Sequence, residues 1–154
     1  MEKSLVKKPF TCQLLIFLHL FLGIGALFGG STLIMDPSGG LIKMPLTLLE
    51  HSPFTSFLIP AIILFVILGV TPLIISYALI TKRPWKGADQ INIFHEMHWS
   101  WAYSLYIGFA LIIWITVQVY FINRVAFIHV FYIAIGLIIQ AVTLFPSVQN
   151  YYRK

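Results

Sequence analysis

Residues 61–68 read AIILFVIL, an apolar run inside a longer window, Ser52–Thr81, that contains no Asp, Glu, Lys or Arg. The run does not alternate apolar and polar residues, as the strands of a membrane β-barrel do. A helix needs about 20 apolar residues to cross the hydrocarbon core of a bilayer, so the window is long enough to span a membrane. Three more windows without these four residue types are also long enough: Pro9–Met35, Met97–Asn123 and Val125–Tyr152.

The composition of the whole chain agrees with this interpretation. Of its 154 residues, 59% are hydrophobic and 10% are charged, whereas a soluble domain carries about 25% charged residues. So little charge does not cover a water-facing surface, which excludes an ordinary soluble enzyme, a nucleic-acid-binding domain and a disordered chain. We therefore interpret the sequence as an integral membrane protein and expect no nucleic-acid partner.

The four windows predict an all-α fold, a transmembrane four-helix bundle that forms a single domain over residues 1–154. Trimmed by proline and polar residues, the predicted spans are about 10–30, 57–80, 99–122 and 125–146. Residues 31–56 or so then form an outer loop between the first two spans. Because this segment holds several Leu, Ile and Met residues, we expect it to be partly ordered and to fold back over the bundle, with a short helix near 45–50.

Basic residues set the orientation of membrane spans, because segments rich in Lys and Arg stay on the cytoplasmic side. Eight of the ten basic residues fall on one side of the predicted spans: Lys3, Lys7, Lys8, Lys82, Arg83, Lys86, Arg153 and Lys154. Lys43 and Arg124 fall on the other side. This distribution predicts that both termini are cytoplasmic.

Small residues and one proline predict how the first two spans pack. Gly25 and Gly29 are four residues apart, as are Ala26 and Gly30, and this spacing lets two helix backbones approach closely. Pro72 lies inside the second span and is expected to kink it. We expect the small residues to serve helix packing within the bundle, with a flexible end at Gly29-Gly30 or a homodimer face as alternatives. A kink at Pro72 could open a cavity for a ligand, but proline is also common in membrane helices without a function.

The third and fourth predicted spans are separated by little more than residues 123–124, so they must form a tight antiparallel hairpin. In such a hairpin, residues whose numbers add up to about 247 lie at equal depth. Gln118 and His129 meet this condition, and a polar group in lipid seeks a partner. We therefore expect these two residues to form a structural hydrogen-bonded pair, and we expect Gln140 at the level of Tyr106 or Ile107.

Ionisable groups are scarce inside the predicted spans, and this limits the chemistry. No Asp, Glu, Lys or Arg lies deep in any span, which argues against a proton-coupled transporter. The single cysteine, Cys12, excludes an intrachain disulfide, a paired-thiol redox centre and a cysteine-rich zinc site. Because the sequence contains no nucleophile–base arrangement, phosphate loop or dinucleotide fingerprint, we predict no catalytic residues and expect no cofactor.

Histidines are the remaining candidates for chemistry. His19 lies near the predicted midplane, and together with Gln140 and Tyr106 it forms the candidate set for binding a ligand inside the bundle. His95 and His98 would share one face of a helix, so both could ligate one metal ion. The alternative for that pair is a polar cap at the membrane interface, paired with nearby basic residues.

Several short motifs give the chain a resemblance to a group of known proteins: Phe28-Gly29-Gly30, Asp36-Pro37-Ser38-Gly39, Ser52-Pro53-Phe54 and Leu58-Ile59-Pro60, followed by Trp99 and Trp101. With these motifs the chain resembles small bacterial four-span integral membrane proteins of uncharacterised function, over most of its length. The resemblance implies the fold and a bacterial inner membrane. It implies no activity, and no functional residue is carried over from it.

These observations lead to three functional hypotheses. The first, favoured by the absence of catalytic groups, is a non-catalytic accessory or partner-binding subunit. Its partners would be the lipid bilayer and another membrane protein or a second copy of the chain. The second is a binder or carrier of a lipophilic ligand, a lipid or a quinone, held in the helix bundle. The third is a haem- or metal-binding membrane enzyme that uses the histidines.

Overall fold

The computed structural model describes residues 7–154, so Lys3 lies outside the described residues. Within this range the chain is helical, and extended pairing is limited to one bridge between Met97 and Arg153. The elements follow in this order: α1 (Phe10–Met35), η1 (Gly40–Ile42), η2 (Leu46–Leu49), α2 (Leu58–Ile63), η3 (Leu64–Val70), α3 (Thr71–Thr81), α4 (Lys86–Ile91), α5 (Trp99–Ile122), α6 (Phe127–Thr143) and α7 (Pro146–Tyr152). The elements η1 and η2 are 3-10 helices, and η3 is a π-helical turn.

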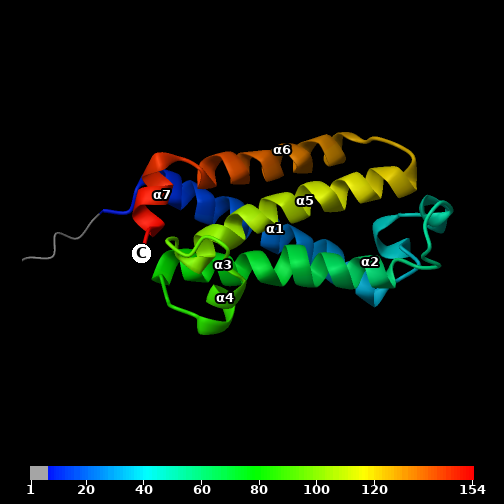
Figure 1. Cartoon of the computed structure of the whole chain (residues 1–154). Coiled ribbons are helices and arrows are strands. Elements are labelled where there is room, and N and C mark those ends of the chain that lie inside the picture. The colour runs from blue at the N-terminus through cyan, green and yellow to red at the C-terminus, as the bar shows by residue number, and fades with distance from the viewer. Residues whose placement is uncertain (1–6) are drawn as a thin grey trace, which may run out of the picture.

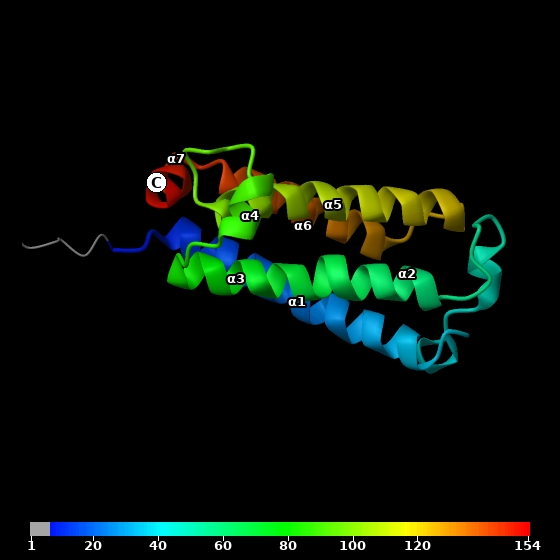
Figure 2. The same cartoon turned by 60° about the horizontal axis from the view of Figure 1, so that its bottom comes forward.

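The helices form two antiparallel hairpins that lie side by side (Figure 1). One hairpin pairs α1 with the continuous helix made of α2, η3 and α3, and the other pairs α5 with α6. The start of α1, the C-terminus, α4 and α7 lie at one end of the molecule, which we call the terminal end (Figure 2). The loop that carries η1 and η2 lies at the opposite end, the loop end, as predicted for the outer loop.

Three helices are long and apolar enough to cross a membrane, namely α1, the combined helix Leu58–Thr81 and α5. The predicted fourth span, 125–146, corresponds to α6, which ends at Thr143 and is followed by α7 at an angle of 64°. Pro146 begins α7, and the residue before a proline disfavours helical geometry. At about 1.5 Å per residue, the 17 residues of α6 cover about 25 Å, less than the hydrocarbon core. The described chain thus has three helices that could span a membrane, or four if α6 and α7 count as one.

The first span is longer than predicted, because α1 continues to Met35. It ends where Asp36 precedes Pro37, the turn that the sequence marks. The second span does not break at Pro72, where a kink was expected. The backbone N–H of Thr71 instead bonds to the carbonyl of Val66, five residues back, which forms the π-helical turn η3. This wider turn accommodates a proline that lacks an N–H and crowds the preceding turn.

Two glycines, Gly23 and Gly30, bring α1 into backbone contact with the second span. The predicted spacing is confirmed only at Gly30, because a Cβ atom on Gly25 or Gly29 would make ordinary contacts. A Cβ atom on Gly30 would lie 2.9 Å from the Cβ of Phe65 and 3.1 Å from the carbonyl oxygen of Ala61. A Cβ atom on Gly23 would lie 3.0 Å from the carbonyl oxygen of Gly69. Only glycine fits such distances, so this close approach holds the first hairpin together.

The second hairpin follows the depth relation that the sequence predicts. A Cβ atom on Gly136 would lie 2.9 Å from Ile112, and one on Gly108 would lie 2.6 Å from the side chain of Gln140. Within each of these two pairs, the residue numbers add up to nearly 247. α5 begins and ends as predicted, since Asn123 leaves the helix in the left-handed conformation (φ 52°).

The terminal end is closed by hydrogen bonds between segments far apart in sequence. The buried hydroxyl of Tyr152 donates to the carbonyl of Leu79 over 2.7 Å, and the indole N–H of Trp101 donates to the carbonyl of Thr143 over 2.8 Å. Lys8 donates from its ammonium group to the carbonyl of Leu79 at the end of α3. The basic groups of the N-terminal, central and C-terminal segments therefore gather at one end of the molecule, as the charge distribution predicts.

The loop at the other end folds back over the helices, which confirms the expected partial order. The backbone N–H of Phe57 donates to the carbonyl of Pro37 over 2.9 Å and ties the two ends of the loop together. Leu33, Phe57 and Ala61 form a small apolar cluster against which the loop residues pack. The expected short helix near 45–50 is present as η2.

Candidate functional site

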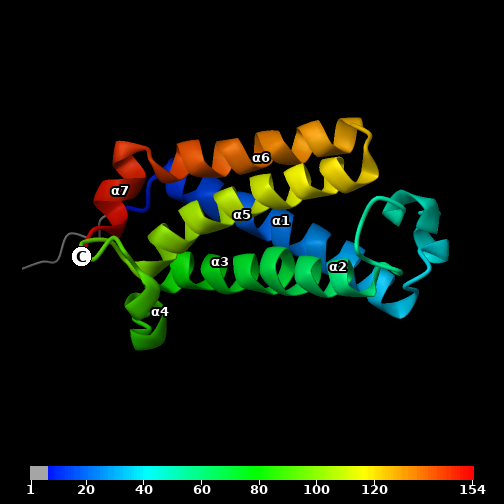
Figure 3. The ribbon, with the colours of Figure 1, turned by 45° about the vertical axis from the view of Figure 1, so that its right-hand side comes forward.

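Two adjacent cavities lie in the half of the molecule near the loop end, where the hairpins separate. The larger, of about 260 Å³, is lined by α1, η3, α5, α6 and one loop residue, Met44. The smaller, of about 70 Å³, lies under the loop. Figure 3 shows α5 close to α3 at the terminal end and farther from α2 toward the loop end. Five residues line both cavities: Met44, Leu64, Trp114, Gln118 and Ile122.

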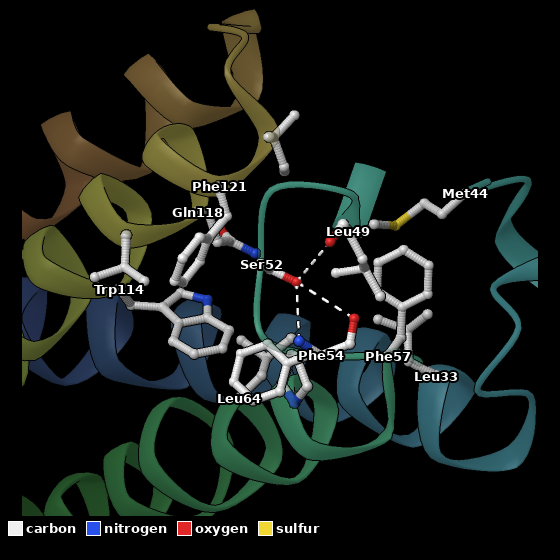
Figure 4. Close-up of a pocket in the computed structure, with 13 residues that line it drawn as sticks. Leu33, Met44, Leu49, Ser52, Phe54, Phe57, Leu64, Trp114, Gln118 and Phe121 are labelled. Carbon is white, nitrogen blue, oxygen red and sulfur yellow. Dashed lines mark hydrogen bonds between the residues drawn. The ribbon is translucent and has the colours of Figure 1, made fainter. Parts of the chain in front are cut away.

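The loop forms one wall of the smaller cavity (Figure 4). Ser52 fixes this wall, because its hydroxyl donates to the carbonyl of Leu49 over 2.9 Å and accepts from the N–H of Phe54 over 3.2 Å. Trp114 and Gln118, both on α5, lie across the cavity from these residues. The loop therefore covers the cavity with a hydrogen-bonded turn.

The larger cavity is mostly apolar, and its polar lining groups come from two helices. Trp114 and Gln118 are on α5, and His129 and Tyr132 are on α6. His129 is 9% exposed and belongs to the first turn of α6. Its Nδ1 accepts a hydrogen bond from the backbone N–H of Ala126 over 3.1 Å. The side chains of the other three residues make no hydrogen bond with any of residues 7–154.

Gln118 and His129 lie at the same depth and line the same cavity, as the hairpin geometry predicts. The hydrogen bond expected between them is absent among the described residues, so that prediction is wrong. His129 turns toward the start of its own helix instead, because the N–H of Ala126 lacks an intrahelical partner there. Gln118 and His129 thus both contribute polar groups to the lining of the cavity, and they do not bond to each other across it.

The candidate set His19, Gln140 and Tyr106 does not line either of these two cavities. His19 is fully buried on α1, with Nδ1 2.9 Å from the carbonyl oxygen of Leu15. The hydroxyl of Tyr106 donates to the carbonyl of Ile91 at the end of α4, over 3.3 Å. The hydroxyl of Tyr106 therefore contacts the terminal end, and binding of a ligand by all three residues stays a prediction.

Gln140 and His19 share one property. The Nε2 atoms of both side chains are buried and have no hydrogen-bond partner among residues 7–154. An unpaired polar group inside a membrane protein is unfavourable. These two atoms are the least satisfied polar groups of the helix interior.

The metal site expected at His95 and His98 is not supported, because residues 92–98 do not form a helix. His98 ends this segment and caps α5: its Nδ1 accepts from the N–H of Ser100, and its Nε2 lies 3.2 Å from the carbonyl oxygen of Arg83. Burial lowers the pKa of His98 below its ordinary value. Both ring nitrogens are occupied, which leaves no lone pair for a metal. Residues 7–154 contain no group of three or more His, Cys, Asp or Glu residues arranged to hold one.

Sequence reasoning identified Gln118 and His129 but missed Trp114 and Tyr132. The depth relation contains the signal, since it places Tyr132 level with Ile115, about one helical turn below Gln118. Comparisons with protein-family models, with curated proteins and with solved structures found no match.

Proposed function

We propose that this chain is a multi-pass membrane protein that binds a lipophilic molecule in the larger cavity between its two helical hairpins. The observation that carries the proposal is an apolar cavity of about 260 Å³ that also contains four polar side chains. Sites for small molecules have this composition, an apolar wall with a few polar groups that fix the orientation. The role of accessory subunit is compatible with the proposal, because such a subunit can also hold a ligand.

The polar groups of the cavity favour an occupant. Trp114, Gln118 and Tyr132 carry hydrogen-bonding groups that no protein atom among residues 7–154 satisfies. In the hydrocarbon region of a membrane, each unsatisfied polar group is unfavourable by several kcal/mol. A ligand with a polar head and an apolar body would satisfy these groups and fill the apolar space.

The cavity has a route to the lipid phase. Gly25 on α1 and Ile128 on α6 line the cavity and are also exposed on the surface of the molecule. An opening between these helices would connect the cavity with the surrounding bilayer. A lipophilic ligand would enter sideways, without passing through water.

Gly29 provides the test, because it lines the cavity and has room beside it. A Cβ atom there would lie 3.8 Å from its nearest neighbour, Leu64, which is an ordinary contact. We expect wild-type protein, purified from membranes, to retain a lipophilic molecule in native mass spectrometry. The Gly29→Leu variant fills the cavity and is expected to lose most of it. The control is Ala134→Leu, which also places a leucine side chain, but on an exposed face of α6. Retention by Gly29→Leu equal to that of the control, or no retention by wild type, would contradict the proposal.

We further propose that the terminal end faces the cytoplasm in a plasma membrane. Lys43 on the loop and Gln90 on α4 are exposed at opposite ends of the molecule, and the native Cys12 is fully buried. In intact cells, a membrane-impermeant maleimide is expected to label the Lys43→Cys variant and to leave Gln90→Cys unlabelled until the membrane is opened. The reverse labelling pattern would show that the loop end faces the cytoplasm, and it would contradict this proposal.

A further inference from the structure

We propose that the ligand of the larger cavity carries a carbonyl group, whose oxygen accepts a hydrogen bond from Nε2–H of His129. This inference rests on the proposed function and names the chemical class of the ligand. An ester-linked lipid and a quinone share this chemistry. A simple hydrocarbon lacks it.

The position of the proton on His129 follows from the start of α6. Ala126 is the N-cap residue and has no side-chain oxygen, so it cannot satisfy the free N–H groups of the first turn. His129 occupies the third position of the helix and accepts the N–H of Ala126 at Nδ1, as a Glu or Gln does in a capping box. A ring nitrogen that accepts carries no hydrogen, so the neutral imidazole carries its proton on Nε2. The helix cap thereby makes Nε2 a donor.

This donor is free to meet a ligand. Nε2 of His129 makes no hydrogen bond with the part of the chain that the structure describes, and the side chain lines the cavity. If the imidazole ring were flipped so that Nε2 accepted the N–H of Ala126, the nitrogen without a hydrogen-bond partner would be Nδ1. Either way the free nitrogen is the protonated one, because the capping nitrogen must accept.

The other polar groups of the cavity are also rich in donors. The indole N–H of Trp114 can only donate, and the amide of Gln118 supplies two N–H groups. The hydroxyl of Tyr132 lies 3.4 Å from the position of a Cβ atom on Gly25, so it reaches across to α1. A carbonyl oxygen only accepts, and it therefore complements this set. An apolar molecule without oxygen would leave every one of these donors unpaired.

Two substitutions at His129 separate the donor from the cap. His129→Gln keeps both functions, because the Gln side chain can accept the N–H of Ala126 through its oxygen and donate through its nitrogen. His129→Glu keeps the cap, since an ionised carboxylate accepts, but it removes the donor. Thermal unfolding of both variants, compared with that of the wild type, checks that a difference in binding does not reflect a lost fold.

The probes are 2-decyl-1,4-naphthoquinone and the matched hydrocarbon 2-decylnaphthalene, each titrated into detergent-solubilised protein by calorimetry at pH 8. An ester-linked and an ether-linked dialkyl glycerol form the second pair of probes and distinguish a lipid from a quinone. We expect a carbonyl probe to bind more tightly than its partner. We expect His129→Glu to weaken its binding by about tenfold, the effect of one lost hydrogen bond, while His129→Gln retains it. The infrared carbonyl stretch of the bound probe is expected to move to lower frequency in wild type and less so in His129→Glu.

The outcomes separate this inference from the proposed function. If carbonyl and matched probes bind equally and Gly29→Leu abolishes both, the cavity binds lipophiles and the inference about the carbonyl is wrong. If His129→Glu binds the quinone and the ester as wild type does, the inference is likewise wrong. If Gly29→Leu leaves the binding of every probe unchanged, the proposed function itself fails.

Discussion

Replacement of Gly30 by alanine is expected to lower the free energy of unfolding by about 1–3 kcal/mol, the range for overpacking a filled contact. The added Cβ atom would lie 2.9 Å from Cβ of Phe65, 3.0 Å from its Cα and 3.1 Å from the carbonyl oxygen of Ala61. The last two atoms belong to the backbone, which cannot yield as a flexible side chain does. α1 and α2 would have to separate, and this would weaken contacts along the whole hairpin.

The neighbouring glycine is the matched control for this prediction. Alanine at Gly29 meets nothing closer than 3.8 Å, and alanine favours a helix over glycine by about 0.5–1 kcal/mol. Gly29→Ala is therefore expected to leave stability unchanged or slightly raised. Unfolding in mixed detergent micelles, followed by circular dichroism, measures both. Equal stability of the two variants would show that α1 does not approach α2 as closely as described.

Features of the fold that depend on charge-free length and on capping residues can be predicted from the sequence. α5 matches its predicted bounds of 99–122, because His98 caps its start and Asn123 ends it. Charge-free length alone does not locate the end of α6, however. The uncharged residues continue to Tyr152, yet Pro146 starts a new helix at 64° to the old one. The length of the uncharged window puts Pro146 at the end of a span. In the structure Pro146 instead begins a separate helix.

The candidate site could be predicted only in part, for a geometric reason. The hairpin relation gives the depth of a residue but not the direction of its side chain around the helix. Gln118 and His129 were correctly placed at one depth, whereas their hydrogen bond depended on a direction that the cap on Ala126 decides. Gln140 and Tyr106 were likewise placed together by depth, yet the hydroxyl of Tyr106 reaches α4. A cavity is formed by the separation of two hairpins, and no local pattern in either hairpin encodes that separation.

Trp101→Ala is expected to lower the free energy of unfolding by about 3–5 kcal/mol, the range for truncating a buried tryptophan. Trp101 is 4% exposed and lies edge-on to Phe94, with ring centroids 5.2 Å apart. Its indole N–H donates to the carbonyl of Thr143, the last residue of α6. Carbonyls at the end of a helix lack intrahelical partners, so the indole supplies one at the point where α6 gives way to α7. Loss of this side chain would remove both the packing and the hydrogen bond that hold α6 against α5.

Two further substitutions divide this effect into its parts. Trp101→Phe keeps an aromatic ring but leaves the carbonyl of Thr143 without the indole donor. The lost hydrogen bond is expected to lower the free energy of unfolding by about 0.5–1.5 kcal/mol, and the smaller ring is expected to lower it further. Trp85→Ala is the control, because Trp85 also packs edge-on against an aromatic ring, that of Trp99, but is 53% exposed. It is expected to lose less than about 1 kcal/mol. If Trp101→Ala and Trp85→Ala unfold with equal ease, Trp101 does not hold α6 on α5. The bend between α6 and α7 would then have to be held by the contacts of α7 itself, such as the bond from Tyr152 to Leu79.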